Sequence, residues 1–381
     1  MNKYDIFDYI NWRKDQSFDD LSFNEIDNLI FSNLSYIRFK DIIPSDKAYI
    51  TVNDAIEAFL KTEITVLDIR DKRDLDFLEA IRNTKRYGNL KLFFHREVYE
   101  SAEETQFAAT LIEIKRNLYY LSYRGTDNFI AGWKEDLNLS FETVAAQKLA
   151  LLYLEEVAKT FIFAKLIVGG HSKGANLAVY ACAHASTKTY KKIIQIYNND
   201  GPGFDFKNID ITPYKHICEK MISFTPGFSF VGQMMQQPMP MTIVESNGTS
   251  ILQHSMYTWL LTPDHLIRLD DIEAHAKTWK YILTSCLDSL NLEERRKFVD
   301  GIYEVILAAN AHDIFEILPG LIKNRKQVQE ILKNMDPATS EAIESAFSQI
   351  FDAFKDSISF SLESFGTSLY SKIFGHERRL K

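Results

Sequence analysis

The stretch LIVGGHSKGANLA, residues 166–178, decides the fold of this chain. It begins as an apolar strand, turns sharply with Ser172 at the apex, and continues as a helix of small residues. Gly170 and Gly174 frame the serine in a G-x-S-x-G pattern, which is typical of the strained strand-to-helix turn called a nucleophile elbow. The strained serine backbone needs neighbours without bulk, and the two glycines supply them. The turn lifts the serine oxygen clear of the sheet and aims the backbone N–H of Lys173 toward a substrate oxygen.

The surroundings of this pentapeptide strengthen the interpretation. Residues 161–168 form a short apolar run of the buried-strand type, and residues 175–183 form a helix rich in small side chains. The alternative is a glycine-rich turn whose serine is unreactive. The sequence favours a reactive serine, because the strand, turn and helix occur in the order that an elbow requires.

A second motif lies upstream of the serine. Residues 119–123 read as a strand that ends in Arg-Gly-Thr at 124–126, and Trp133 and Asp136 follow. With residues 170–178 this pattern resembles the class 3, or fungal-type, lipases. The chain resembles more closely a poorly characterised group of bacterial hydrolase-like proteins related to those lipases. Further stretches carry that likeness over roughly residues 1 to 265, namely Asp8–Arg13, Phe23–Leu29, Tyr197–Phe204, Gln253, His254 and Trp259.

The resemblance implies an α/β-hydrolase fold, a mostly parallel sheet with helices on both faces. It also assigns Thr126 to the oxyanion hole, opposite the backbone N–H of Lys173. Two donors from different loops hold an alkoxide better than one. The alternative is that Arg124-Gly125-Thr126 is only a β-turn, with Arg124 paired to Asp127 or Asp136.

The base for Ser172 is sought among nine histidines. The chain order of hydrolases, Ser then acid then His, excludes His95. His254 follows a β-branched strand at residues 242–246 and a turn, which is the loop position that the order favours, and the resemblance points to the same residue. His265 is the runner-up.

The acid is expected to be Asp200. It follows the strand at residues 192–197, and function in open α/β sheets concentrates at the carboxyl ends of strands. In class 3 lipases the acid follows the next strand instead, and here Ser229 stands at roughly that position. Asp200 can serve from the preceding strand, because the acid only orients and stabilises the imidazolium. The alternative is that Asp200 is a turn residue that caps the following Gly-Pro-Gly.

The composition is that of an ordinary globular protein, with 46% hydrophobic and 25% charged residues among 381. The three cysteines show no disulfide or metal pattern, so we expect neither a metal nor a cofactor. A net charge of −8 disfavours nucleic acid as a partner. No secretory signal and no apolar run of about 20 residues is recognisable, so we expect a cytoplasmic protein without a transmembrane segment.

Three regions are expected. Residues 1–90 form a mostly helical segment packed on the core, residues 91–264 form the α/β-hydrolase core, and residues 265–381 form a helical subdomain. Within the core the pattern predicts antiparallel strands near 105–115 and 118–124 and a helix near 142–160. Parallel strands are expected near 162–168, 192–197, 219–224 and 242–246, and C-terminal helices at 270–287, 292–309 and 326–332.

The last helix carries an apolar stripe at helical spacing from Ile343 to Ile373. We expect it to pack on a neighbouring helix or on another protein or copy of the chain. Lipid binding is the alternative, although the polar face is not rich in Lys and Arg. Residues 233–241 contain four methionines, which either floor a flexible acyl pocket or fill a gap under a loop.

Two classes of function follow. The first is a serine hydrolase, lipase- or esterase-like, that cleaves a small-molecule carboxylic ester, thioester or lipid through an acyl-Ser172 intermediate. The second is a catalytically silent binding or regulatory protein that keeps the hydrolase fold. The intact elbow and His254 favour the first, whereas the missing lipase-type acid favours the second.

Overall fold

The strands of the sheet lie side by side in the same order as in the chain. The structure, a computed structural model, describes residues 3–65, 68–70, 72–100, 105–126, 143–229, 231–273, 276–277, 292–308, 321, 323–337 and 339–344. Within these residues nine strands form one sheet. They are β1 (Tyr49–Thr51), β2 (Lys91–Glu100), β3 (Thr105–Lys115), β4 (Leu118–Tyr123), β5 (Lys165–His171), β6 (Ile193–Asn199), β7 (Met221–Pro226), β8 (Thr242–Val244) and β9 (Arg268–Leu269).

The directions of the strands change along the sheet. β1 to β4 pair antiparallel, β4 to β8 pair parallel, and β9 returns antiparallel to β8. A mixed α/β architecture with a mostly parallel middle is therefore confirmed. The expected strands from residue 105 to 246 are present with ends shifted by a few residues. Strand β2, which the sequence pattern did not predict, is the long partner of β3.

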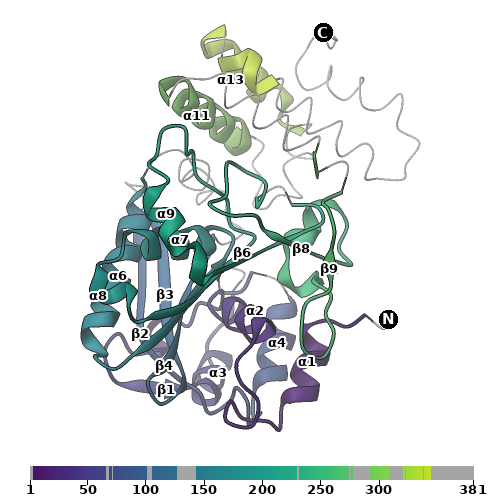
Figure 1. Cartoon of the computed structure of the whole chain (residues 1–381). Coiled ribbons are helices and arrows are strands. Elements are labelled where there is room, and N and C mark those ends of the chain that lie inside the picture. The colour runs from purple at the N-terminus through teal and green to yellow at the C-terminus, as the bar shows by residue number, and fades with distance from the viewer. Residues whose placement is uncertain are drawn as a thin grey trace. The chain divides into compact units, whose positions relative to one another are not determined.

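The helices that alternate with the parallel strands share one face of the sheet (Figure 1). They are α6 (Ala145–Thr160), α7 (Lys173–His184), the short α8 (Thr187–Tyr190) and α9 (Thr212–Ile217). Right-handed crossovers place connecting helices on one face when a parallel sheet grows in a single direction. Leu121, Val168 and Ile196 accordingly pack in one core with residues of α6 and α7.

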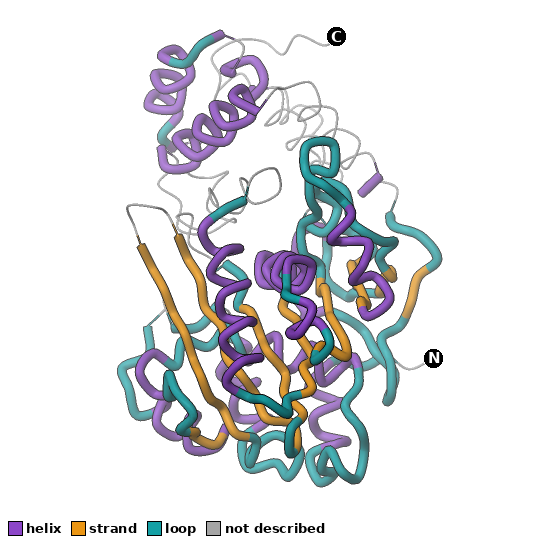
Figure 2. Tube along the Cα trace, turned by 60° about the vertical axis from the view of Figure 1, so that its left-hand side comes forward, coloured by secondary structure: helices purple, strands orange, loops and turns teal. Residues whose placement is uncertain are grey.

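The opposite face is covered by the N-terminal helices, so the sheet lies between two helical layers (Figure 2). These are α1 (Ile6–Arg13), α2 (Glu25–Leu34), α3 (Val52–Leu60) and α4 (Arg73–Ile81). Successive strand side chains point to opposite faces. Tyr120, Ile167 and Tyr197, each next in sequence to a residue of the first core, therefore pack with these helices instead.

Helix α2 is fixed at its start by a buried charge. Asn24 caps the helix, and Asp27 completes the capping box. The Asp27 carboxylate also pairs with Arg86 at 2.6 Å, and both side chains are fully buried. Tyr87 donates its hydroxyl to the same carboxylate at 2.8 Å. Breaking a buried pair of this kind costs about 3–5 kcal/mol, so α2 is held firmly where it passes under the strands.

The chain forms two compact units, residues 1–127 with 143–273 and residues 128–142 with 274–381. The described part of the second unit contains α11 (Leu292–Ala308) and α13 (Arg325–Asn334), which pack on each other. Both helices were expected near these positions. The helix expected at 270–287 and the stripe beyond Ile343 fall mostly outside the described residues. The expected division at residues 90 and 264 stays a prediction.

Candidate active site

Ser172 occupies a strained turn between β5 and α7. Its backbone has φ 58° and ψ −132°, a conformation that residues other than glycine rarely adopt. The Ser172 N–H donates to the carbonyl of Asn199 on the adjacent strand at 3.0 Å. A Cβ on Gly170 would lie 2.5 Å from the carbonyl carbon of Gly174, and one on Gly174 would collide with the carbonyl of Tyr123. Both glycines of the pattern are therefore required by close backbone contacts.

The Arg-Gly-Thr segment lies beside this turn. Tyr123 pairs with Gly170 in the parallel β4–β5 ladder, so Arg124, Gly125 and Thr126 leave the sheet at the same edge as Ser172. A Cβ on Gly125 would lie 2.7 Å from the carbonyl of His171. Thr126 is half-buried here, and Lys173 begins α7 one residue beyond the serine. The two residues expected in the oxyanion hole thus follow neighbouring strands.

Arg124 has a partner that the sequence did not suggest. Its guanidinium pairs with Glu97 of β2 at 2.6 Å, and Arg38 pairs with the same carboxylate oxygen at 2.9 Å. Asp127 and Asp136 lie outside the described residues. Burial tends to raise the pKa of Glu97, but the His95 ring, whose Nε2 lies 3.8 Å away, and the hydrogen bond and charge of Arg124 hold that pKa well below its usual value. Glu97 therefore stays ionised and anchors the start of the Arg-Gly-Thr segment.

Asp200 is a fully buried carboxylate at the end of β6. It accepts hydrogen bonds from His254 Nδ1 at 2.6 Å, Ser229 Oγ at 2.7 Å and Thr225 Oγ1 at 2.8 Å. Its backbone has φ 54°, and its N–H donates to the carbonyl of Phe224 at 2.8 Å. The sequence placed Asp200 and Ser229 as competing positions for an acid. The structure joins them, with the serine hydroxyl supporting the aspartate.

His254 approaches Asp200 from the short 3₁₀ helix η4 (Ser250–His254). Its side chain is 23% exposed, while Asp200 is fully enclosed. The runner-up, His265, is not brought to this place. It bonds to Asp264 at 2.7 Å in a surface turn where both side chains are more than half exposed. The structure therefore joins His254, and not His265, to Asp200.

His171, the residue before the serine, is an additional part of the site that sequence reasoning did not single out. Its Nε2 lies 2.8 Å from the backbone carbonyl of His254, and its Nδ1 lies 2.8 Å from the hydroxyl of Tyr36. Burial, with the nearby charges of His254 and Arg70, lowers the pKa of His171 well below its usual value. The ring is therefore neutral. Because a carbonyl only accepts, Nε2 carries the proton and Nδ1 accepts from Tyr36.

A buried amide pair lies under the same strands. Asn28 of α2 and Asn199 exchange hydrogen bonds of 2.8 and 3.0 Å, and Asn199 also donates to the carbonyl of Gly170 at 2.8 Å. Tyr120 and Ser32 complete the network, at 2.7 Å to Asn28 and 3.1 Å to Asn199 respectively. Both amides stood in stretches that carried the family resemblance. Their contact across 171 residues has no signature in the sequence itself.

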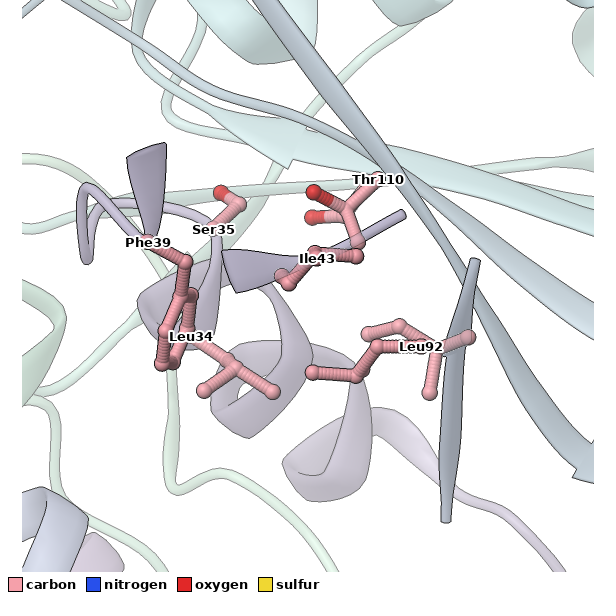
Figure 3. Close-up of a pocket in the computed structure, with 8 residues that line it drawn as sticks. Leu34, Ser35, Phe39, Ile43, Leu92 and Thr110 are labelled. Carbon is pink, nitrogen blue, oxygen red and sulfur yellow. The ribbon is translucent and has the colours of Figure 1, made fainter. Parts of the chain in front are cut away.

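Features that would suggest other chemistry are absent from the part of the chain that the structure describes. No cluster of three or more His, Cys, Asp or Glu side chains there could hold a metal ion. None of the helices there has the length and apolarity to cross a membrane. A cavity of about 10 Å³ lies between the end of α2 and strands β2–β4, lined in part by Leu34, Ser35 and Thr110 (Figure 3). That volume suits at most one water molecule, so this cavity is no substrate site.

Comparison with known proteins places the chain in a family. No curated protein matches it. The family model described as Mbeg1-like matches residues 81–304, which is more than half of the 381 residues and spans β2 to β9 with every residue joined around Asp200. The chain therefore belongs to the Mbeg1-like family, which is related to the class 3 lipase-like proteins.

Proposed function

We propose that the protein is a serine hydrolase of α/β-hydrolase fold that cleaves a carboxylic ester or thioester through an acyl-Ser172 intermediate. One observation carries the proposal. A buried carboxylate, Asp200, bonds to His254 at the same sheet edge where Ser172 stands in a strained turn. A strained backbone and a buried charge both lower the stability of a protein, and both are concentrated at functional sites. The chain order of the three residues is also that of the α/β-hydrolases.

The roles follow from hydrogen-bond chemistry. Asp200 only accepts, so Nδ1 of His254 carries the proton and Nε2 holds the lone pair. Nε2 takes the Ser172 proton as the oxygen attacks the substrate carbonyl, and then returns it to the leaving alcohol or thiol. Water repeats the sequence on the acyl-serine and releases the acid. Asp200 stabilises the imidazolium in both halves.

The negative oxygen formed during attack needs donors. The N–H of Lys173 lies in the first turn of α7, where backbone N–H groups lack helical acceptors and the helix dipole favours negative charge. We assign this N–H and Thr126 to the oxyanion hole. The Glu97–Arg124 ion pair supports the assignment, because it anchors the segment that carries Thr126.

The support around Asp200 favours it over an acid at the lipase-type position. Ser229 stands there and donates to Asp200 at 2.7 Å, and Thr225 donates from the strand before it. A carboxylate at residue 229 would instead lie against Asp200 and repel it. The departure from the lipase pattern is thus compatible with a working triad.

A fluorophosphonate probe tests the proposal, because it reacts covalently with activated serines. We expect the full-length protein to be labelled at neutral pH and Ser172→Ala to remain unlabelled. Ser186→Ala is the matched control, since Ser186 is an exposed helix cap and should not change labelling.

An unlabelled wild-type protein, in a tube where a known esterase is labelled, would contradict the proposal. It would favour the silent, hydrolase-like binding protein instead. Equal labelling of Ser172→Ala would show that another residue reacts with the probe.

A further inference from the structure

The amino ends of the parallel strands form the sheet edge opposite to Ser172. The turn that enters β5 there is closed by a hydrogen bond of 3.0 Å from the Ala164 N–H to the Phe161 carbonyl. Ile162 and Phe163 lie at its centre and are 71% and 80% exposed. They are the most exposed large apolar side chains among the described residues.

This turn is held in place from inside. The ring of Phe161 packs on Phe93, Phe94 and Tyr119, with ring centroids 5.1 to 6.1 Å apart. Nζ of Lys192 donates to the carbonyls of Ala158 and Phe161 at 2.6 and 3.0 Å. Ile162 and Phe163 are therefore presented to solvent by a fixed turn.

Exposed cations stand at the same edge of the sheet as the two apolar side chains. Lys159 precedes the turn and Lys165 follows it, and the Lys165 N–H donates to Asn117 in the β3–β4 turn at 2.8 Å. The exposed Lys115 and Arg116 directly precede Asn117, so that contact places them at the same edge. The exposed Lys191 precedes β6 there as well. We call Ile162, Phe163 and these five cations the basic tip.

Nearby acidic groups are engaged elsewhere. Glu155 accepts from the Ser186 N–H and from the Thr189 hydroxyl, both at 2.6 Å. Glu113 pairs with Lys91 at 3.2 Å. The five cations of the basic tip outnumber these two carboxylates, so the tip is locally positive on a chain whose net charge is −8. This contrast favours an anionic partner.

A shallow apolar groove lies at the same edge, on the face covered by the N-terminal helices. Its volume is about 260 Å³, and Phe18, Phe23, Leu118 and Ile194 line it together with Lys115. This edge therefore carries two apolar surfaces, the turn on one face of the sheet and the groove on the other, together with the cations of the basic tip.

We propose that the basic tip docks on the surface of an anionic lipid bilayer. Apolar side chains insert between the acyl chains while Lys and Arg bind the charged headgroups, and stable attachment takes both signals. The exposed Ile–Phe pair favours a bilayer over a nucleic acid, which rewards cations but not aliphatic insertion. Because Ser172 lies at the other edge, docking leaves the candidate active site accessible and does not depend on the proposed hydrolase activity.

Co-sedimentation of the full-length protein with vesicles tests the proposal. We expect binding to vesicles of phosphatidylglycerol and phosphatidylcholine in equal amounts, little binding to phosphatidylcholine alone, and release at high salt. Replacing Ile162→Ser and Phe163→Ser together should weaken partitioning on the order of 100-fold. Lys159→Glu with Lys165→Glu should weaken it by at least about 25-fold, at about fivefold for each lysine removed.

Two matched controls carry the same chemical changes away from the tip. Lys72→Glu with Lys207→Glu alters two exposed lysines, and Tyr99→Ser removes a ring that is 61% exposed near the far end of β2. Both should bind like the wild type. The proposal is overturned if the wild type ignores anionic vesicles, if it binds neutral vesicles equally, or if the tip variants bind as well as the controls. Binding to a soluble polyanion in place of vesicles would also overturn it.

Discussion

The two edges of the parallel strands differ in how they hold polar groups. At the carboxyl edge, Asp200 is fully buried and takes three side-chain hydrogen bonds, and His171 is buried between two partners. At the amino edge, cations stand exposed around Ile162 and Phe163. A buried charge has one geometry and costs stability when that geometry is broken, whereas an exposed lysine costs almost nothing to replace. The first arrangement suits chemistry and the second suits contact with a surface.

The largest expected effect is a loss of turnover when a buried group at the carboxyl edge is changed. Asp200→Asn should reduce turnover of a p-nitrophenyl ester by about 10⁴-fold, because the amide favours the wrong tautomer of His254. Asp264→Asn is the matched control, since that carboxylate pairs with His265 in an exposed turn. Steady-state kinetics measure both, with circular dichroism to verify folding. Equal turnover of Asp200→Asn and the wild type would mean that Asp200 is only a turn residue.

The sequence predicts best those site residues whose signals lie close to them in the chain. Ser172 was placed in its turn because Gly170 and Gly174 stand within two residues of it, and each has a steric reason that any elbow shares. Asp200 was placed from the end of its strand. Its support by Ser229 has no such signal, because a serine at the lipase-type acid position indicates only that no acid stands there.

The sequence pattern does not predict contacts between segments that are far apart in the chain. Tyr36 and His171 meet across 135 residues, and the Glu97–Arg124 pair depends on β2, a strand that was not predicted. The segment KLFFHREVYE lacks the regular alternation that marks a strand, and its pairing with β3 shifts register between Phe93 and Arg96. The catalytic roles of the placed residues stay predictions until they are measured.

A second, smaller effect concerns His171. His171→Leu should lower kcat by about 100-fold, because loss of the bond to the His254 carbonyl lets the imidazole move away from Ser172. His171→Gln keeps an N–H donor and should recover much of that loss. A proton NMR spectrum should also show a far-downfield Nδ1–H resonance of His254 in the wild type and in His171→Gln, but not in His171→Leu. If Leu and Gln behave alike in both measurements, His171 is only a packing residue.

The smallest effect is on stability. The pKa of His171 lies well below its unfolded value of 6.5, so between these values the unfolded chain binds a proton that the folded chain does not. The free energy of unfolding should therefore fall as the pH drops below about 6.5, by up to about 1.4 kcal/mol per pH unit from this group.

Urea unfolding at several pH values from about 5 to 7 measures that slope. His171→Gln should flatten it, because glutamine does not titrate. An unaltered slope in His171→Gln would mean that His171 binds its proton over the same pH range in the folded protein as in the unfolded chain.

The formation of an acyl-serine at residue 172 is the central claim, and acid-quench trapping tests it most directly. The full-length protein is mixed with a p-nitrophenyl ester, quenched within the first turnovers, digested and analysed by mass spectrometry. We expect the mass of the acyl group on the peptide that contains Ser172, with its loss over time as water completes the reaction. Ester cleavage with the acyl group on another residue, or on none, would contradict the account.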